Sequence, residues 1–193
     1  MARYPDIYLL RHGQTEWNVQ GRLQGGMDSA LTPLGITQAQ AQGRVLAGCD
    51  LTGFRAVISP MGRARHTAML AVAPVIPDIA EDTRLREIGV GDWAGRQRDE
   101  LGVAYDPTAV PGETFALYEA APNGEGLARL RLRCQDFLDD LDGPAVIVTH
   151  GITGHMLRIL WLGWAADRLG ELPGGQGVVF HLSDAGHRVL TDD

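Results

Sequence analysis

Short apolar runs alternate along the chain with longer segments in which apolar residues recur at helical spacing. The runs at 7–10, 56–59 and 145–148 contain almost no charged position, which is typical of strands buried on both faces of a sheet. A shorter apolar pair at 75–76 predicts one more strand. Helices are predicted between these runs, at 33–46, 62–73, 127–141 and 154–162. This alternation predicts an α/β fold, a three-layer α/β/α sandwich around a mainly parallel sheet.

Two segments depart from the alternation. Apolar residues at 178–182 and 189–190 flank Asp184-Ala-Gly186, a turn sequence that predicts an antiparallel hairpin at the C-terminal end. Residues 94–124 have weak periodicity and many Gly, Pro and Asp residues, so we expect a small irregular and helical insertion there. The length suits one domain over 1–193.

Three of the predicted strands end in unusual polar residues. Arg11-His12-Gly13 follows the first strand, and His150-Gly151 follows the third. The second strand leads through Ser59-Pro60 to Arg63. Because the carboxyl ends of parallel strands lie along one edge of a sheet, these side chains should converge on one pocket. A histidine or arginine taken singly is more often a structural or solvated residue. Buried cations require anionic partners, and no carboxylate neighbours these residues in the sequence, so a substrate could supply the anion.

Composition narrows the kind of substrate. The net charge is −7, which argues against a nucleic-acid partner, so positive charge at the site must be local. No apolar stretch is long enough to span a membrane or to act as a signal peptide. The two cysteines, Cys49 and Cys134, form no paired motif. We therefore expect a cytoplasmic protein whose oligomeric state the sequence leaves open.

The residue types at the strand ends suit phosphate chemistry. Guanidinium groups bind phosphate oxygens in pairs, and a neutral imidazole nitrogen can attack phosphorus. A metal site is the competing use of two histidines. It is disfavoured because no carboxylate or cysteine stands at ligand spacing with them. We expect neither a metal nor another cofactor.

The same residues belong to a longer set of motifs. The set begins at Leu10-Arg-His-Gly-Gln-Thr-Glu-Trp-Asn18 and continues through Gly21-Arg-Leu-Gln24-Gly25, Asp28 and Leu31-Thr-Pro-Leu-Gly35. It resumes at Arg63-Ala64, Leu85-Arg-Glu87-Ile-Gly89 and Val148-Thr-His150-Gly151. In order and spacing this set resembles the histidine phosphatase superfamily, in its phosphoglycerate-mutase-like branch, over nearly the whole chain.

The resemblance implies a role for each matching residue. His12 would be the nucleophile that becomes phosphohistidine, and Glu87 would give a proton to the leaving oxygen. Arg11, Arg63 and His150 would hold the phosphate. Asn18, Gln24 and the backbone of Gly151 would complete the pocket.

Three functions remain open at this point. We favour a metal-independent phosphomonoester hydrolase that acts through a phosphohistidine on a small phosphorylated metabolite. A phosphoglycerate mutase would need extra basic residues over the pocket; the candidates between Glu87 and His150 are Arg96, Arg98, Arg129, Arg131 and Arg133, and we expect the last three to be a solvated helix face. A non-catalytic phosphate-binding regulator is the third. The aromatic residues Trp93, Tyr105, Phe115 and Tyr118 would either wall the leaving-group side or pack in a small core. The substrate itself stays open among sugar phosphates, nucleotides, phosphoglycerates and α-ribazole phosphate.

Overall fold

A six-stranded sheet forms the centre of the molecule. The computed structural model describes residues 3–102 and 111–192, and the strand order within them is β3-β2-β4-β1-β5-β6. The strands are β1 (Ile7–Arg11), β2 (Arg55–Ile58), β3 (Ile79–Glu81), β4 (Ala145–Thr149), β5 (Val179–Ser183) and β6 (Gly186–Leu190). β1, β2, β3 and β4 are parallel, whereas β5 and β6 run antiparallel at one edge. The predicted mainly parallel sheet with its C-terminal hairpin is confirmed.

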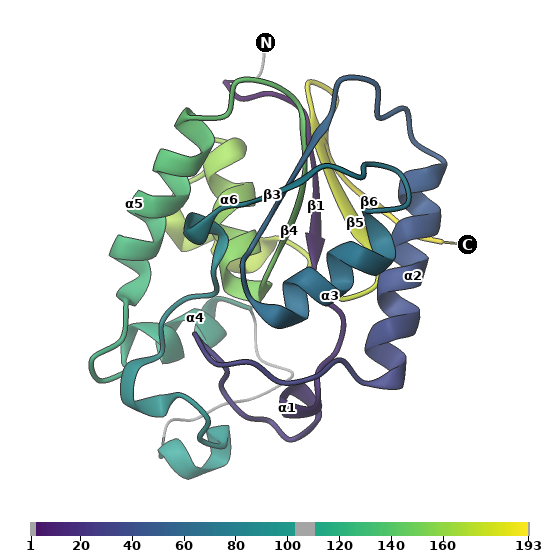
Figure 1. Ribbon diagram of the computed structural model, residues 1–193. Helices are drawn as coiled ribbons and strands as arrows, with labels where there is room; N and C mark the ends of the chain where they lie inside the picture. Colours follow the sequence, from purple (N-terminus) through teal and green to yellow (C-terminus); the bar gives the residue numbers. More distant parts are fainter. Residues whose placement is uncertain (1–2, 103–110, 193) are drawn as a thin grey trace.

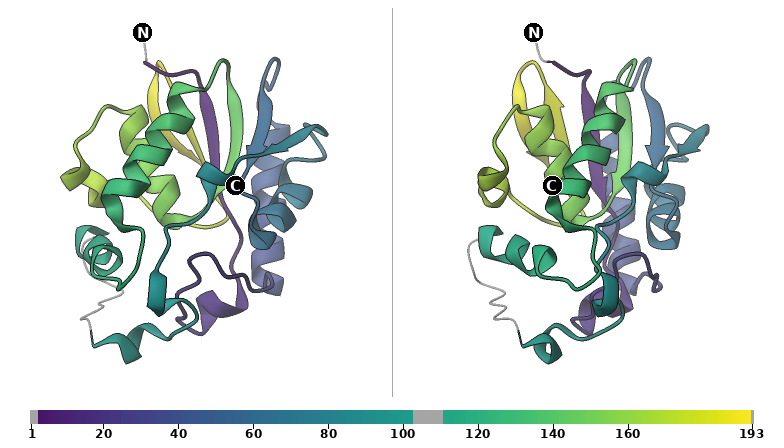
Figure 2. Two further views of the ribbon diagram at one scale, coloured as in Figure 1. Left: turned by 60° about the vertical axis from the view of Figure 1, so that its left-hand side comes forward. Right: turned by 90° about the vertical axis from the view of Figure 1, so that its left-hand side faces the viewer.

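Helices cover both faces of this sheet (Figure 1 and the left view of Figure 2). The α-helices of the described residues are α1 (Glu16–Val19), α2 (Pro33–Ala47), α3 (Gly62–Ala71), α4 (Pro111–Glu119), α5 (Gly126–Asp139) and α6 (Gly151–Trp161). α2 and α3 lie on one face, and α5 and α6 lie on the other, so the three-layer architecture is also confirmed. Thr32 accepts a hydrogen bond from the backbone N–H of Gly35 and begins α2, with Pro33 at its first position.

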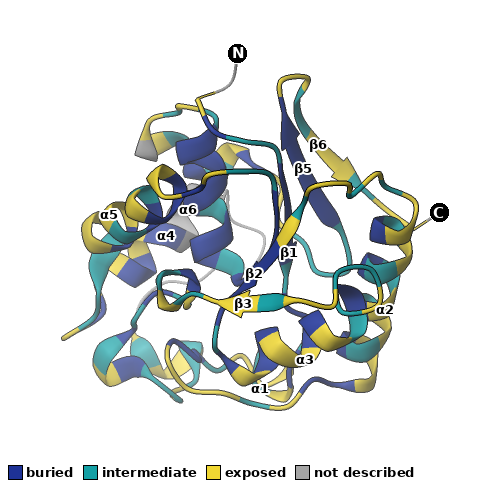
Figure 3. Cartoon of the chain, turned by 45° about the horizontal axis from the view of Figure 1, so that its top comes forward, coloured by how far each residue is buried: buried dark blue, intermediate teal, exposed yellow. Residues whose placement is uncertain are grey.

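The alternation of side chains along the strands produces two separate cores. In β1, Leu9 packs with the layer of α5 and α6, while Leu10 packs with the layer of α2 and α3. Ile147 and Val148 of β4 divide in the same way. Both strands are therefore buried on both faces, which explains their uninterrupted apolar sequence. Figure 3 shows the central strands largely buried, the edge strands β3 and β6 more exposed, and the outer faces of the helices exposed.

Two element boundaries differ from the sequence prediction. The strand predicted at 75–76 is wrong: the backbone N–H groups of both residues bond to the carbonyl of Val72 in a turn, and the strand forms at Ile79–Glu81. Two apolar residues cannot distinguish a strand from a turn that buries its side chains. Helix α6 begins at Gly151 instead of residue 154, immediately after His150.

The described part of the segment between β3 and α5, residues 82–102 and 111–125, lies mostly beneath the carboxyl end of the sheet together with α1 (Figure 1). It contains the short 3-10 helices η1 (Thr83–Leu85), η2 (Gly91–Trp93) and η3 (Arg98–Leu101), followed by α4. A further 3-10 helix, η4 (Ala166–Glu171), follows α6. Tyr105 lies outside the described residues. Within the part of the chain that the structure describes, no helix has both the length and the apolar character needed to cross a membrane.

Candidate active site

The two histidines follow directly after two neighbouring parallel strands. Arg11 at the end of β1 pairs in register with Thr149 at the end of β4. His12 and His150 come next in each chain segment, and their ring centroids are 5.2 Å apart. Both side chains are buried, at 3% and 1% exposed. The sheet register therefore brings together two residues that are far apart in the sequence.

The hydrogen bonds of His12 define its tautomer. Nδ1 lies 2.7 Å from the carbonyl oxygen of Gly13, which can only accept, so Nδ1 carries the proton. Nε2 lies 3.3 Å from Nε of Arg63, which can only donate, so Nε2 holds a lone pair. Burial, together with the charges of Arg11 and Arg63, holds the pKa of His12 well below its usual value. The imidazole is thus neutral, with its lone pair on the nitrogen that faces Arg63.

His150 is anchored through one ring nitrogen. Its Nε2 lies 2.7 Å from Oγ of Ser59, at the end of β2, while its buried Nδ1 has no hydrogen-bond partner. Burial first, and then the charge of Arg63, keeps the pKa of His150 well below its usual value. A buried polar nitrogen without a partner is costly, and a bound ligand would relieve that cost.

Arg11 lies against the start of helix α6. A Cβ built on Gly151 would be 3.3 Å from Cζ of Arg11, so the missing side chain at Gly151 gives the guanidinium its room. Nε of Arg11 is buried and has no hydrogen-bond partner. Burial lowers the pKa of Arg11 from its ordinary value. Gly151 therefore contributes space for Arg11, and it does not line the pocket that is formed by His12, Arg63 and Glu87.

Arg63 begins helix α3 and is 2% exposed. Its guanidinium forms an ion pair with Asp28 at 2.7 Å and donates to the carbonyls of Gly25 and Met27. No carboxylate neighbours Arg63 in the sequence, but a loop 35 residues away supplies Asp28, so the substrate is not the sole anion that Arg63 can bind. The ion pair fixes the guanidinium, and its Nε remains directed at His12.

Glu87 binds the amino end of helix α6. Its Oε1 accepts from the backbone N–H groups of Ile88 and Thr153 and from the Thr153 hydroxyl, and its Oε2 accepts from the N–H of Ile152. These donors hold the carboxyl group of Glu87 at the start of α6. The early start of α6 at Gly151 is what supplies them.

Asn18 and Gln24 are joined through Thr15. Asn18 Oδ1 accepts from the backbone N–H of Thr15 at 3.1 Å, and Gln24 Nε2 donates to Oγ1 of Thr15 at 2.8 Å. Gln176, in the loop before β5, donates to the carbonyl of His12 at 3.0 Å and to Asn18 Oδ1 at 3.4 Å. Sequence patterns carry no signal for Gln176, since it stands in a glycine-rich loop far from every motif.

Most of these residues meet at one pocket of about 380 Å³. Of the eight candidate residues, Arg11, His12, Asn18, Gln24, Arg63 and Glu87 line it, whereas His150 and Gly151 line a smaller neighbouring pocket together with Arg11. The wall of the first pocket also includes four residues given no role from the sequence: Arg22, Leu23, Gly25 and Val90. Arg98 and Tyr118 reach it from the segment below the sheet.

The aromatic and arginine residues of this segment differ in how they compare with the expectations from the sequence. Tyr118 lines the pocket, whereas Trp93 and Phe115 pack in the core beside α5 and α6. Arg133 is not a solvated residue, because it forms a largely buried ion pair with Glu125 at 2.5 Å. Among the described residues, no cluster of three or more His, Cys, Asp or Glu side chains could hold a metal ion.

A family model and several known proteins match this chain. A family model described as the histidine phosphatase superfamily (branch 1) matches residues 7–189. A glucosyl-3-phosphoglycerate phosphatase of Mycolicibacterium vanbaalenii is 32% identical over 94% of this chain and 84% of its own length. A protein of Salmonella choleraesuis, named a probable phosphoglycerate mutase, is 39% identical over 84% of this chain and 79% of its own length.

The solved structures extend the comparison to the fold. The α-ribazole phosphatase of Shigella flexneri superposes with a TM-score of 0.78 and 26% identity, covering 96% of each chain. The family match spans the strands, the strand-end histidines and the pocket described above. The chain therefore belongs to branch 1 of the histidine phosphatase superfamily.

Proposed function

We propose that this protein is a phosphomonoester hydrolase that transfers a phosphoryl group from a small metabolite to Nε2 of His12 and then to water. The observation that carries the proposal is the neutral His12, whose protonated Nδ1 is fixed by Gly13 and whose Nε2 lone pair faces the pocket arginines. Its lowered pKa keeps that lone pair available at neutral pH.

The first step forms a bond from His12 Nε2 to phosphorus and breaks the bond from phosphorus to the leaving oxygen. As the lone pair is used, Nε of Arg63 can no longer donate to His12 and becomes free to bind a phosphate oxygen. The unpartnered Nε of Arg11 and Nδ1 of His150 supply further sites for phosphate oxygens. A dianionic phosphate would favour a protonated His150, which could then donate.

The second step returns His12 to its starting form. Water attacks phosphorus, inorganic phosphate leaves, and a carboxylate accepts the proton that water gives up. Glu87 suits this role because its carboxyl group lines the pocket and is held in position by the start of α6. For the first step we propose that the same carboxyl group, protonated while the phosphate anion is bound, gives its proton to the leaving oxygen.

Relatives support the hydrolase assignment at the level of reaction class. Two of the proteins compared above are named phosphatases. One specific observation keeps the mutase alternative: Arg98, in the segment where a mutase needs extra basic residues, lines the pocket. We propose that catalysis needs no metal, since arginines provide the positive charge.

Release of inorganic phosphate tests the proposal. The purified protein is incubated with p-nitrophenyl phosphate and a panel of alkyl phosphates, with and without excess EDTA. We expect turnover in both conditions, and loss of several orders of magnitude in His12→Ala. Phosphate transfer to a second substrate molecule without release would favour the mutase. Binding of substrate without turnover would favour the regulator, and activity abolished by EDTA and restored by metal would contradict metal independence.

A further inference from the structure

The backbone oxygen of His12 accepts a hydrogen bond from a side chain of the loop before β5. Nε2 of Gln176 donates to this oxygen at 3.0 Å. His12 is buried, and within residues 3–102 and 111–192 no other donor bonds to its carbonyl. A buried carbonyl that loses its partner costs free energy. The main chain of the nucleophile therefore depends on Gln176 for its position.

The same amide nitrogen also bonds to Asn18. It lies 3.4 Å from Oδ1 of Asn18, which accepts in addition from the backbone N–H of Thr15 at 3.1 Å. A backbone N–H can only donate, so the oxygen of the Asn18 amide faces Thr15 and Gln176. Nδ2 of Asn18 then lies on the other side of the amide, and among the described residues it has no hydrogen-bond partner. Because Asn18 lines the catalytic pocket, its Nδ2 is available to a phosphate oxygen.

Buried side chains hold both ends of the loop that carries Gln176. At the start of the loop, the carbonyl of Pro173 accepts from the guanidinium of Arg158 on α6 at 2.9 Å. At its end, the carbonyl of Val178 accepts from Nε2 of Gln42 on α2 at 2.9 Å. Arg158 and Gln42 are 1% and 0% exposed. The loop is thus anchored to a helix on each face of the sheet.

Two glycines flank this glutamine and allow the loop to pack closely. Gly175 has φ of +142° and Gly177 has φ of +82°, conformations that residues with a side chain rarely adopt. A Cβ on Gly177 would lie 3.2 Å from Cγ of Gln38 on α2. Oε1 of Gln38 accepts from the N–H of Gln14 at 2.8 Å. One side chain therefore contacts both the loop before β5 and the loop after β1.

We propose that Gln176 is a positioning residue for phosphoryl transfer, whose amide fixes the main chain of His12 and orients the amide of Asn18 toward the phosphate. Gln176 lines an adjoining cavity of about 660 Å³ and does not line the catalytic pocket, so it acts through these two residues. Without its N–H donors, the His12 carbonyl is unpaired and the Asn18 amide is free to rotate. This inference rests on the proposed hydrolase function and adds a residue to its machinery.

Two substitutions separate hydrogen-bond donation from shape. Gln176→Met keeps the length of the side chain and removes the amide, whereas Gln176→Glu keeps the shape and replaces the N–H donors with an acceptor. Each should lower the single-turnover rate of His12 phosphorylation about 10- to 100-fold, since a misplacement of about 1 Å can cost about 10²-fold. The rate is read as release of p-nitrophenolate from p-nitrophenyl phosphate with the protein in excess. Either variant suffices if the other does not fold.

A matched glutamine provides the control. Gln40 is exposed on α2 and lines neither the catalytic pocket nor the adjoining cavity. Gln40→Ala should therefore phosphorylate His12 at the wild-type rate. Urea unfolding of every variant identifies the conditions in which all of them are folded, and the rates are compared only there.

A double-mutant cycle tests whether Gln176 acts through Asn18. Asn18→Ala alone should lower the same rate about 10- to 100-fold, because a hydrogen bond to a charged group is lost. In the Gln176→Met background, Asn18→Ala should cost less than about threefold, since the Asn18 amide is then already misplaced. A residue that only stabilised the loop would give independent losses that multiply.

The possible results separate the inference from the proposed function. A rate within about threefold of wild type in Gln176→Met or in Gln176→Glu overturns the positioning role, because N–H donation is then dispensable. Independent losses in the double-mutant cycle overturn the action through Asn18. If the wild-type protein releases no p-nitrophenolate, the proposed function fails, and this inference fails with it.

Discussion

At the scale of single residues, the site depends on which atoms have partners and which do not. Both ring nitrogens of His12 form hydrogen bonds: Nδ1 donates to Gly13, and the lone pair of Nε2 accepts from Arg63. His150 and Arg11 each keep one buried nitrogen without a partner. Residue types and strand ends were enough to predict that these three would converge. The neutralisation of Arg63 by Asp28 could not be predicted, because it depends on the path of a loop.

Glu87→Gln should separate the two proposed proton transfers. An alkyl phosphate leaves as a strongly basic alkoxide and needs a proton, so the variant should lose about 10²- to 10⁴-fold in the rate of His12 phosphorylation. p-Nitrophenolate is already a stable anion and should lose far less. The measurement is single-turnover formation of the phosphoenzyme, where the second step does not contribute.

The comparison between substrates also controls for folding. The side-chain amide introduced by Glu87→Gln would direct an N–H at one of the backbone N–H groups that now bind the carboxylate, which lowers the stability of the start of α6. That loss affects both substrates equally, so only their ratio reports proton donation. Equal losses would remove Glu87 from this role, and Asp92 would be the next carboxylate to test.

At the scale of elements, the loop after β1 is held in place by its contact with helix α2. A Cβ on Gly13 would lie 2.2 Å from the carbonyl oxygen of Gly35, and a Cβ on Gly35 would lie 2.0 Å from that of Gln14. The N–H of Gly13 donates to Thr67 on α3, and the N–H of Gln14 donates to Gln38 on α2. The loop that carries His12 is therefore fixed by both helices of one layer.

Gly35→Ala should test this contact. The added methyl group must push α2 away from the loop, which we expect to cost roughly 1–3 kcal/mol of unfolding free energy, as overpacking does. It should also lower kcat, because the nucleophile moves with the loop. Urea unfolding and steady-state rates measure the two effects. Gly48→Ala, at the other end of α2, is the control: its nearest neighbour would be Val45 O at 3.5 Å. Similar behaviour of the two variants would contradict the account.

The helices and strands also show which features of the fold sequence patterns can predict and which they cannot. Helix α5 was predicted within a few residues because it buries a continuous apolar stripe, and α2 because Thr32, Pro33 and Gly48 mark its ends. The strand β3 was misplaced, since its three residues are mostly exposed at a sheet edge and carry little apolar signal. The pairing between the segments around Arg22 and Gln97 could not be predicted, because no local pattern encodes it.

At the scale of the whole molecule, the buried histidines link folding to pH. Burial lowers the pKa of His12, His150 and His181, and it lowers the pKa of His155 and His187 to about 4. In the unfolded chain these groups titrate near their ordinary value. Between about pH 6.5 and about pH 4 the unfolded state therefore binds more protons than the folded state, and the folded state loses stability as the pH falls.

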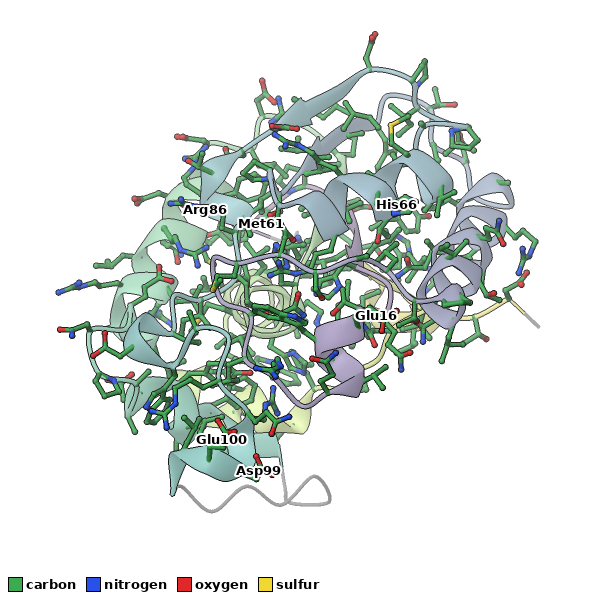
Figure 4. All side chains as sticks on the ribbon, turned by 60° about the horizontal axis from the view of Figure 1, so that its bottom comes forward. Glu16, Met61, His66, Arg86, Asp99 and Glu100 are labelled. Atoms are coloured by element: carbon green, nitrogen blue, oxygen red, sulfur yellow. The ribbon has the colours of Figure 1, made fainter. Side chains whose placement is uncertain are left out.

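Unfolding in urea at about pH 7.5, 6.0 and 5.0 should reveal this linkage. The unfolding free energy should fall with pH, with each such histidine contributing at most about 1.4 kcal/mol per pH unit. His155→Gln should flatten the dependence, and replacement of His66, which is exposed on α3 (Figure 4), is the control. Stability that stays constant over this pH range would contradict the neutral state assigned to these rings.

The central claim is that His12 itself carries the phosphoryl group during turnover. The most direct measurement is rapid quench of the wild-type protein with a ³²P-labelled alkyl phosphate, followed by mapping of the labelled peptide. The account predicts label that is labile to acid and stable to base, located on His12, formed and lost at rates that account for turnover, and absent from His12→Ala. Full turnover with no phosphoenzyme, or label located on another residue, would contradict it.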